Sequence, residues 1–261
     1  MVNNTMQRAG QTTTKPSFKE GATGKQRELA ERDQRYLAVA RRLLLDEGIA
    51  QCTVNRVAQE TGFSKVTLYQ RFRSKEQLLV EVGLGCRQEL AQVTRCAARL
   101  EGPPRVRLEA IGYGIGHYAK RYAENVRILS MIDSEVVLTK APEELQEQMA
   151  ALDVEIFGLM ADCVHRGIEA GDLVLPPNVE PHAIVFLMWT SIDGWAHCTG
   201  GGAPMDEIEL RNPFEALALC IRHLLDAFGW RPLMREWDYE QTSREVYRLL
   251  AQDPLLDFAE E

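Results

Sequence analysis

The chain has 261 residues, 45% of them hydrophobic, and a formal net charge of −8. This length and composition are sufficient for a substantial buried core. No apolar run approaches the roughly 18 residues that a membrane-spanning helix needs, and residues 1–17 lack the apolar centre of a secretion signal. We therefore expect a cytoplasmic protein that makes no use of a membrane.

The charge is divided unevenly along the chain. Residues 1–80 contain 14 Lys and Arg against 8 Asp and Glu, a balance of +6, whereas residues 81–261 contain 16 against 30, a balance of −14. Attraction to phosphate is local, because physiological salt screens charges over about 8 Å. The acidic total therefore does not exclude nucleic-acid binding by the N-terminal part of the chain.

The cysteines and histidines show no spacing typical of a metal site or a redox motif. We expect neither a metal nor another cofactor. We expect the cysteines to be reduced and to lie mainly in the core, with a thiol sensor as the alternative; they are Cys52, Cys86, Cys96, Cys163, Cys198 and Cys220.

Residues 1–32 carry six basic and three acidic residues and show no apolar periodicity before Leu29. They are predicted to form a flexible basic arm. Such a segment is either a solvated tail or an arm that adds phosphate or minor-groove contacts to a DNA-binding domain.

The first predicted helix begins after Asp33, whose carboxylate can cap it, and ends at Gly48. Its apolar residues recur at helical spacing: Leu37, Ala40, Leu43 and Leu44. The helix therefore has one face suited to a core.

Two short helices follow, over residues 53–61 and 64–72. Thr53 and Ser64 are suited to N-capping, and Gly62 is suited to the left-handed position that ends a helix. The apolar residues of each helix fall on one face. The second helix turns its polar and basic residues outward, namely Lys65, Thr67, Tyr69, Gln70 and Arg71.

Ser74 is predicted to cap a further helix, with Gln77 three residues on as the partner of a capping box. Lys75 then lies in the first turn, where a cation opposes the helix dipole. A phosphate bound nearby would account for that unfavourable placement.

This segment alone is consistent with a generic capped helical hairpin. However, the run Thr61-Gly-Phe-Ser-Lys-Val-Thr-Leu-Tyr-Gln-Arg-Phe-Arg-Ser-Lys-Glu-Gln-Leu78 resembles the DNA-binding head of the TetR family of transcriptional regulators. The resemblance implies a three-helix DNA-binding domain over residues 33–80, with a helix-turn-helix at residues 53–72.

The resemblance also implies roles for residues of the two short helices. Those expected to contact base edges are Asn55, Lys65, Val66, Thr67 and Gln70. Those expected to contact the phosphate backbone are Thr53, Ser64, Tyr69, Arg71 and Lys75.

The remainder of the chain is a series of helical patterns with no competing strand alternation, so the fold class is all-α. The predicted helices span residues 79–100, 106–123, 125–138, 142–170, 179–197 and 213–228. The last two are apolar on more than one face, so they either form the centre of the domain or pair with a second subunit. The resemblance implies that residues 81–229 bind an effector and form a homodimer that reads a palindromic operator.

Gly112, Gly114 and Gly116 lie within one helical pattern, where each glycine costs up to about 1 kcal/mol relative to alanine. Either close helix packing or a cavity beside Tyr113 and His117 would account for them. Trp189 and Asp193 share a face of a later helix. We expect these four polar and aromatic side chains to line a pocket for a small, mostly apolar effector, although each also fits an ordinary core position.

Residues 230–261 extend past the point where many members of the family end. Residues 238–251 are predicted to form a helix that either covers the dimer or is solvated.

We thus expect a ligand-responsive, sequence-specific DNA-binding regulator that is not an enzyme: a repressor released from its operator by a small effector. One alternative is a constitutive or partner-controlled DNA-binding protein. The other is a helical enzyme, but the sequence has no phosphate-binding loop, nucleophile elbow or metal spacing to support it.

Overall fold

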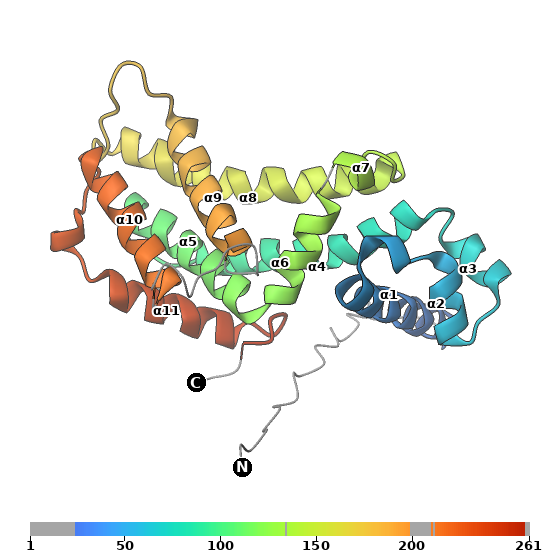
Figure 1. The fold of residues 1–261 in the computed structure, drawn as a ribbon. Helices are drawn as coiled ribbons and strands as arrows, with labels where there is room; N and C mark the ends of the chain where they lie inside the picture. The colour runs from blue at the N-terminus through green and yellow to red at the C-terminus, as the bar shows by residue number, and fades with distance from the viewer. Residues whose placement is uncertain (1–23, 134, 199–209, 211, 259–261) are drawn as a thin grey trace, which may run out of the picture.

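The computed structural model describes residues 24–133, 135–198, 210 and 212–258. Within these ranges the chain is helical and contains no strand, as predicted. Figure 1 shows a small head of α1–α3 at one end of a larger bundle. The elements are α1 (Gly24–Gln51), α2 (Val54–Thr61), α3 (Lys65–Arg71), α4 (Lys75–Ala97), α5 (Pro104–Arg121), α6 (Ala123–Ile132), α7 (Glu135–Leu138), α8 (Glu143–Glu169), α9 (Pro181–His197), α10 (Pro213–Ala227), a 3-10 turn at Met234–Glu236 and α11 (Tyr239–Gln252).

The head has its own buried centre. Tyr36 of α1 is fully buried and makes edge-on ring contacts with Phe63, at 5.2 Å, and with Phe72, at 6.1 Å. Leu43 and Leu68 are also fully buried. The apolar faces predicted for the three helices therefore meet in one core.

The start of α1 corrects one prediction. The helix begins at Gly24, so Asp33 lies inside it and does not cap it. Residues 24–32, expected to belong to the arm, are helical, and the rest of that predicted arm lies outside the described residues. At the other end, Gly48 has φ of 80° and interrupts the helical backbone where the sequence placed the stop.

Helix α4 belongs to both parts of the molecule. Its N-terminal residues Leu78 and Leu79 are buried beside the head, and its later residues Leu90 and Val93 are buried in the bundle. The boundary expected between residues 80 and 81 therefore falls inside a continuous helix. Helix α4 therefore connects the end of α3 directly to the bundle.

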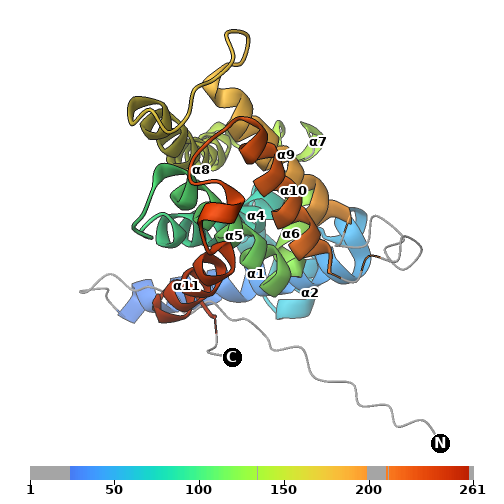
Figure 2. The same ribbon diagram turned by 90° about the vertical axis from the view of Figure 1, so that its left-hand side faces the viewer.

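The C-terminal extension is part of the same core. Trp230 is fully buried, and its indole packs so closely on α8 that a Cβ at Gly167 would lie 2.7 Å from the ring. Helix α11 packs against α5 and α4 (Figure 2), with Val246 and Leu250 fully buried. The extension therefore packs on the bundle of its own chain, which is neither of the two arrangements that the sequence suggested.

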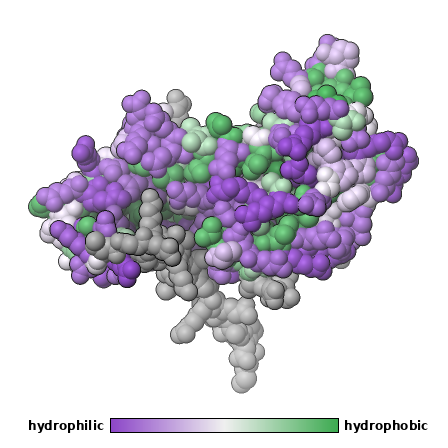
Figure 3. Space-filling model, turned by 180° about the vertical axis from the view of Figure 1, so that it is seen from behind, coloured by the Kyte–Doolittle hydropathy of each residue, from purple (hydrophilic) through white to green (hydrophobic). Residues whose placement is uncertain are grey.

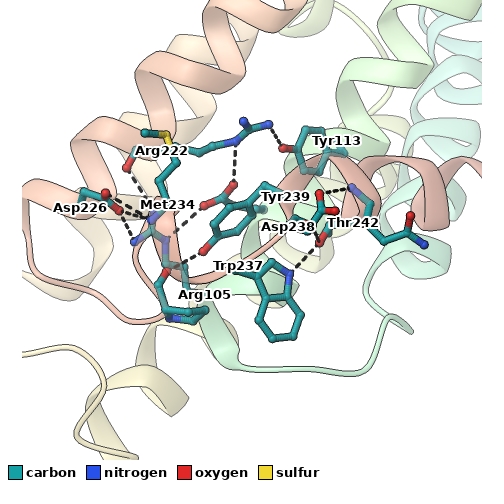
Figure 4. Close-up of polar contacts among 12 residues, drawn as sticks. Arg105, Tyr113, Arg222, Asp226, Met234, Trp237, Asp238, Tyr239 and Thr242 are labelled. Atoms are coloured by element: carbon teal, nitrogen blue, oxygen red, sulfur yellow. Dashed lines mark hydrogen bonds and ion pairs between the residues drawn. The ribbon is translucent and has the colours of Figure 1, made fainter.

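A buried network of charged groups joins α5, α10 and this extension (Figure 4). The Arg105 guanidinium lies 2.6 Å from Asp226 and 3.2 Å from Glu109, and it also donates to the backbone carbonyl of Trp230. Arg222 lies 3.6 Å from the other oxygen of Glu109. Burial raises the pKa of Glu109 to about 7, although the two arginines act in the opposite direction.

The cysteines are unpaired thiols. Cys52, Cys86, Cys96 and Cys163 are buried, as expected of core residues, whereas Cys198 is half-buried and Cys220 is exposed.

Candidate nucleic-acid interface

The interface is built on three capped helix starts. The Thr53 hydroxyl accepts from the backbone N–H of Arg56 at 3.3 Å, and Ser64 accepts from Thr67 at 3.1 Å. Gly62 between them has φ of 74°, the left-handed conformation that ends α2. These local predictions are confirmed.

The third start, at α4, differs in one detail from the predicted capping box. Ser74 accepts from the backbone N–H of Gln77 at 3.0 Å. The Gln77 side chain, however, accepts from the N–H of Arg73 at 2.9 Å, one residue before the cap, and donates to the carbonyl of Arg71. Gln77 therefore ties the end of α3 to the start of α4.

Helix α3 has one buried and one open face. Leu68 and the following Phe72 are fully buried, whereas Val66 is 67% exposed and Tyr69 is 46% exposed. The residues expected to contact bases lie on the open surface of α2 and α3: Asn55, Lys65, Val66 and Gln70 are exposed, and Thr67 is half-buried. The fold thus leaves four of these five side chains exposed and the fifth partly exposed.

The residues expected to contact phosphate fall into two groups. Thr53 and Ser64 act as caps, and the Ser64 hydroxyl also lies 2.7 Å from that of Thr67. Tyr69 is exposed, and Lys75 is half-exposed with Nζ 3.4 Å from the carbonyl of Ala50.

Arg71 is placed differently from the expectation. Its Nε lies 2.6 Å from a carboxylate oxygen of Asp33, and its two terminal nitrogens donate to Glu81. The guanidinium also lies 4.4 Å from the ring centre of Phe72. Arg71 thus joins α3 to α1 and α4, and its donors are directed to one carboxylate on each of these two helices.

One basic residue of the surface was missed. Arg73, between α3 and α4, is exposed and its side chain forms no ion pair with any described residue. The sequence feature that could have identified Arg73 is its position immediately before the Ser74 cap and two residues from Lys75. By contrast, Arg56 is neutralised by Glu47 and Glu60.

The structure separates the four side chains expected to share an effector pocket. Trp189 and Asp193 line a cavity of about 360 Å³ among α4, α5, α6 and α9. Tyr113 and His117 lie elsewhere. The hydroxyl of Tyr113 accepts from Arg222 (Figure 4), and the His117 ring lies 5.6 Å from Phe214 and 5.3 Å from Tyr247.

The glycines of α5 are explained by close packing. A Cβ at Gly116 would lie 2.0 Å from the Phe214 ring, and one at Gly114 would lie 2.8 Å from Ala97. The space beside Gly116, next to Tyr113 and His117, is thus filled by Phe214 from α10, a contact that no local pattern could predict.

Arg87 is a cavity residue that the sequence did not point to. This α4 residue is 4% exposed, and its guanidinium pairs with Asp133 at the end of α6 and, at 3.2 Å, with Asp153 of α8. Its Nε is buried without a hydrogen-bond partner among the described residues. The sequence feature that could have identified Arg87 is its charge between the apolar positions Leu84 and Leu90.

Other kinds of site find little support in the described ranges. No cluster of three or more His, Cys, Asp or Glu residues there could hold a metal ion. No helix in that part of the chain is both long enough and apolar enough to cross a membrane.

Comparison with known proteins places the head and the whole fold. Residues 37–82 match the sequence model of the bacterial regulatory proteins of the tetR family. No curated protein matches the chain significantly.

Solved structures share the fold at low sequence identity. A tetR-family regulatory protein from Rhodococcus RHA1 has a TM-score of 0.58 at 15% identity, over 76% of this chain and 97% of that one. PfmR from Thermus thermophilus has a TM-score of 0.53 at 20% identity, over 77% and 97%. The ketosteroid transcriptional regulator KstR2 of Mycobacterium tuberculosis has a TM-score of 0.51 at 15% identity, over 76% and 93%.

The family-specific match covers the helix-turn-helix with its caps, and the fold of solved family members extends over the bundle behind it. Residues 37–82 are therefore similar to the bacterial regulatory proteins of the tetR family, and the chain as a whole shares the fold of solved structures from that family.

Proposed function

We propose that the protein is a sequence-specific DNA-binding repressor that places α3 in the major groove. The observation that carries this proposal is the open face of α3, whose polar residues project from a short helix fixed by two caps and a buried opposite face. A helix of this kind fits the width of the major groove, where base edges can be distinguished.

The protein makes two sets of contacts with DNA, one to base edges and one to the phosphate backbone. Base edges are read by Asn55, Lys65, Val66, Thr67 and Gln70; the exposed methyl groups of Val66 suit a thymine methyl. The phosphate backbone is held by Thr53, Ser64, Tyr69 and Lys75, which fix the register without reading sequence. We add Arg73 to this second set and leave out Arg71, because its donors already bind Asp33 and Glu81.

The repressor acts as a homodimer through α9 and α10. Apolar residues of both helices are exposed: Phe186 is 70% exposed, Leu219 is 45% and Leu224 is 40%. The face seen from behind in Figure 3 is mainly hydrophilic, with apolar residues in small groups. Pairing α9 and α10 with the same helices of a second copy would bury these side chains and present two recognition helices to a palindromic site.

A small effector that enters the cavity beside Trp189 releases the DNA. The cavity is of a size that holds a small molecule, and its lining includes the α4 residue Arg87, whose partners lie on α6 and α8. A ligand that displaces either carboxylate changes the position of α4, and hence of α3. The effector is small and mostly apolar, because Leu90, Ile115 and Trp189 are among the residues that line the cavity.

Base reading is tested with Gln70→Ala and Lys75→Ala in fluorescence-anisotropy titrations of a bound sequence and its single-base variants. Gln70→Ala changes the preference at one or two positions, whereas Lys75→Ala weakens all sequences alike and reduces the salt dependence. Equal weakening of every sequence by both substitutions would contradict the assignment.

Ligand response is tested by screening small molecules for release of the protein from DNA. Trp189→Ala should reduce the response to an active compound, whereas Trp237→Ala, outside the cavity, should not. If no compound alters DNA binding, a constitutive or partner-controlled regulator is the better account. Conversion of a candidate compound by the purified protein would support the enzyme alternative.

A further inference from the structure

A groove of about 680 Å³ lies between α5 and α11, along the C-terminal extension. It shares no lining residue with the cavity beside Trp189. It also lies away from α3, since α11 packs along the bundle rather than on the head (Figures 1 and 2). The groove is therefore used neither by the proposed DNA contacts nor by the proposed effector.

Among the described residues, four cations line this groove and no carboxylate does, although residues 81–261 carry a net charge of −14. Lys120 and Arg121 lie in the last turn of α5, where cations stabilise the helix dipole. That explanation does not extend to Arg244 and Arg248, which lie one turn apart within α11. Like charges at this spacing destabilise a helix slightly, so an interaction outside the helix should compensate for them.

The four cations keep donors available. Among the described residues, Lys120 and Arg248 form neither an ion pair nor a hydrogen bond. Arg244 donates to the neutral Gln241, at 3.1 and 3.2 Å. Arg121 pairs with Asp257 at 3.6 Å, but both side chains are at least 48% exposed, so the pair is weak.

The floor of the groove is polar and links the two helices. His117 Nε2 of α5 lies 3.3 Å from the hydroxyl of Ser243 of α11, and its ring lies 5.3 Å from that of Tyr247. All three side chains are half-buried. The groove therefore combines a hydrogen-bonding floor with a positively charged rim contributed by both helices.

We propose that this groove binds a compact organic anion with at least two negative charges, either a phosphate ester or a polycarboxylate. Planar guanidinium groups bind such oxyanions through paired, charge-assisted hydrogen bonds. The volume suits a small molecule. Because the rim residues come from α5 and α11, the bound anion joins the C-terminal extension more firmly to the bundle.

The test is isothermal titration of the full chain with two probes, inorganic pyrophosphate and citrate. The groove variant is the double substitution Arg244→Gln and Arg248→Gln. A matched control removes two exposed cations outside the groove, Lys140→Gln and Arg235→Gln. Neither pair of residues lies in the buried core or on the head, so we expect both variants to fold and to bind DNA as the wild type does. Circular dichroism and DNA binding check this.

At least one probe should bind the wild type, and the groove variant should bind it at least about tenfold more weakly, because charge-assisted hydrogen bonds are removed. The control should bind as the wild type does, and the wild-type affinity should fall as salt is raised. Preference for pyrophosphate or for citrate identifies the oxyanion. Absence of binding by both probes, or equal weakening in the groove and control variants, would overturn the proposal.

Discussion

Arg71 offers a test that separates its structural contacts from a contact with DNA. Its guanidinium, 32% exposed, pairs with Asp33 of α1 and with Glu81 of α4, which is 11% exposed. The ring of Phe72 lies 4.4 Å away. Arg71→Ala removes all these contacts at once and leaves Glu81 without its arginine.

The cost follows from this partial burial. An exposed ion pair contributes about 0–1 kcal/mol, whereas removing one partner of a buried pair costs about 3–5 kcal/mol. The cation–π contact adds about 0.5–1 kcal/mol. For half-buried groups we therefore expect Arg71→Ala to lower the free energy of unfolding by about 2–4 kcal/mol.

Urea unfolding measures this decrease, and a double-mutant cycle with Glu81→Gln isolates the pair. The coupling energy should be about 1 kcal/mol or more, as for residues in direct contact. Arg71→Lys should recover part of the stability, since an ammonium cannot reproduce the paired geometry.

The salt dependence of DNA binding tests whether Arg71 contacts phosphate instead. Removing one side chain that neutralises a phosphate reduces the slope of log K against log salt by about 0.9. We expect Lys75→Ala to reduce this slope and Arg71→Ala to leave it nearly unchanged. An unaltered stability together with a reduced slope in Arg71→Ala would refute the reasoning and return Arg71 to the residues that hold phosphate.

Three further predictions concern the bundle. Trp230→Ala should lower the free energy of unfolding by about 3–5 kcal/mol in urea titrations. The control Trp237→Ala, at a side chain that is 39% exposed, should lower it far less. Equal decreases in the two variants would show that the extension is not part of the core. Phe186→Glu should shift the protein from dimer to monomer in sedimentation velocity. The control Val154→Glu, at an equally exposed residue of α8, should leave the dimer intact. A dimer unaffected by Phe186→Glu would contradict the proposed interface. The pKa of Glu109 is raised to about 7 from an ordinary 4.5, so between these pH values the folded state keeps a proton on Glu109 that the unfolded state has lost, and the free energy of unfolding falls as pH rises from 4.5 to 7. Glu109→Gln should flatten this pH dependence in urea titrations at a series of pH values. An identical pH profile in both proteins would count against the raised pKa.

Local chemistry made the head predictable. Thr53, Gly62 and Ser64 act on backbone groups within three residues of themselves, so their roles can be inferred from a short stretch of sequence. Asp33 was misassigned because a carboxylate before an apolar pattern also fits a cap. Its partner, Arg71, lies 38 residues away, beyond any local rule.

The bundle was less predictable because its decisive contacts are distant in sequence. The glycines of α5 indicated either packing or a cavity, and the answer depended on Phe214 from α10. Arg87 likewise obtains its partners from α6 and α8. Trp230 and α11 joined the core because their apolar residues find space on α8, α5 and α4.

Selection of bound sites from a random pool of double-stranded DNA tests the central claim most directly. The account predicts enrichment of an inverted repeat whose half-site centres lie about 10 base pairs, or a multiple of that, apart. Gln70→Ala should alter the enriched motif within each half-site. Recovery of no motif, or of sites without two-fold symmetry, would contradict a dimer that reads DNA with α3.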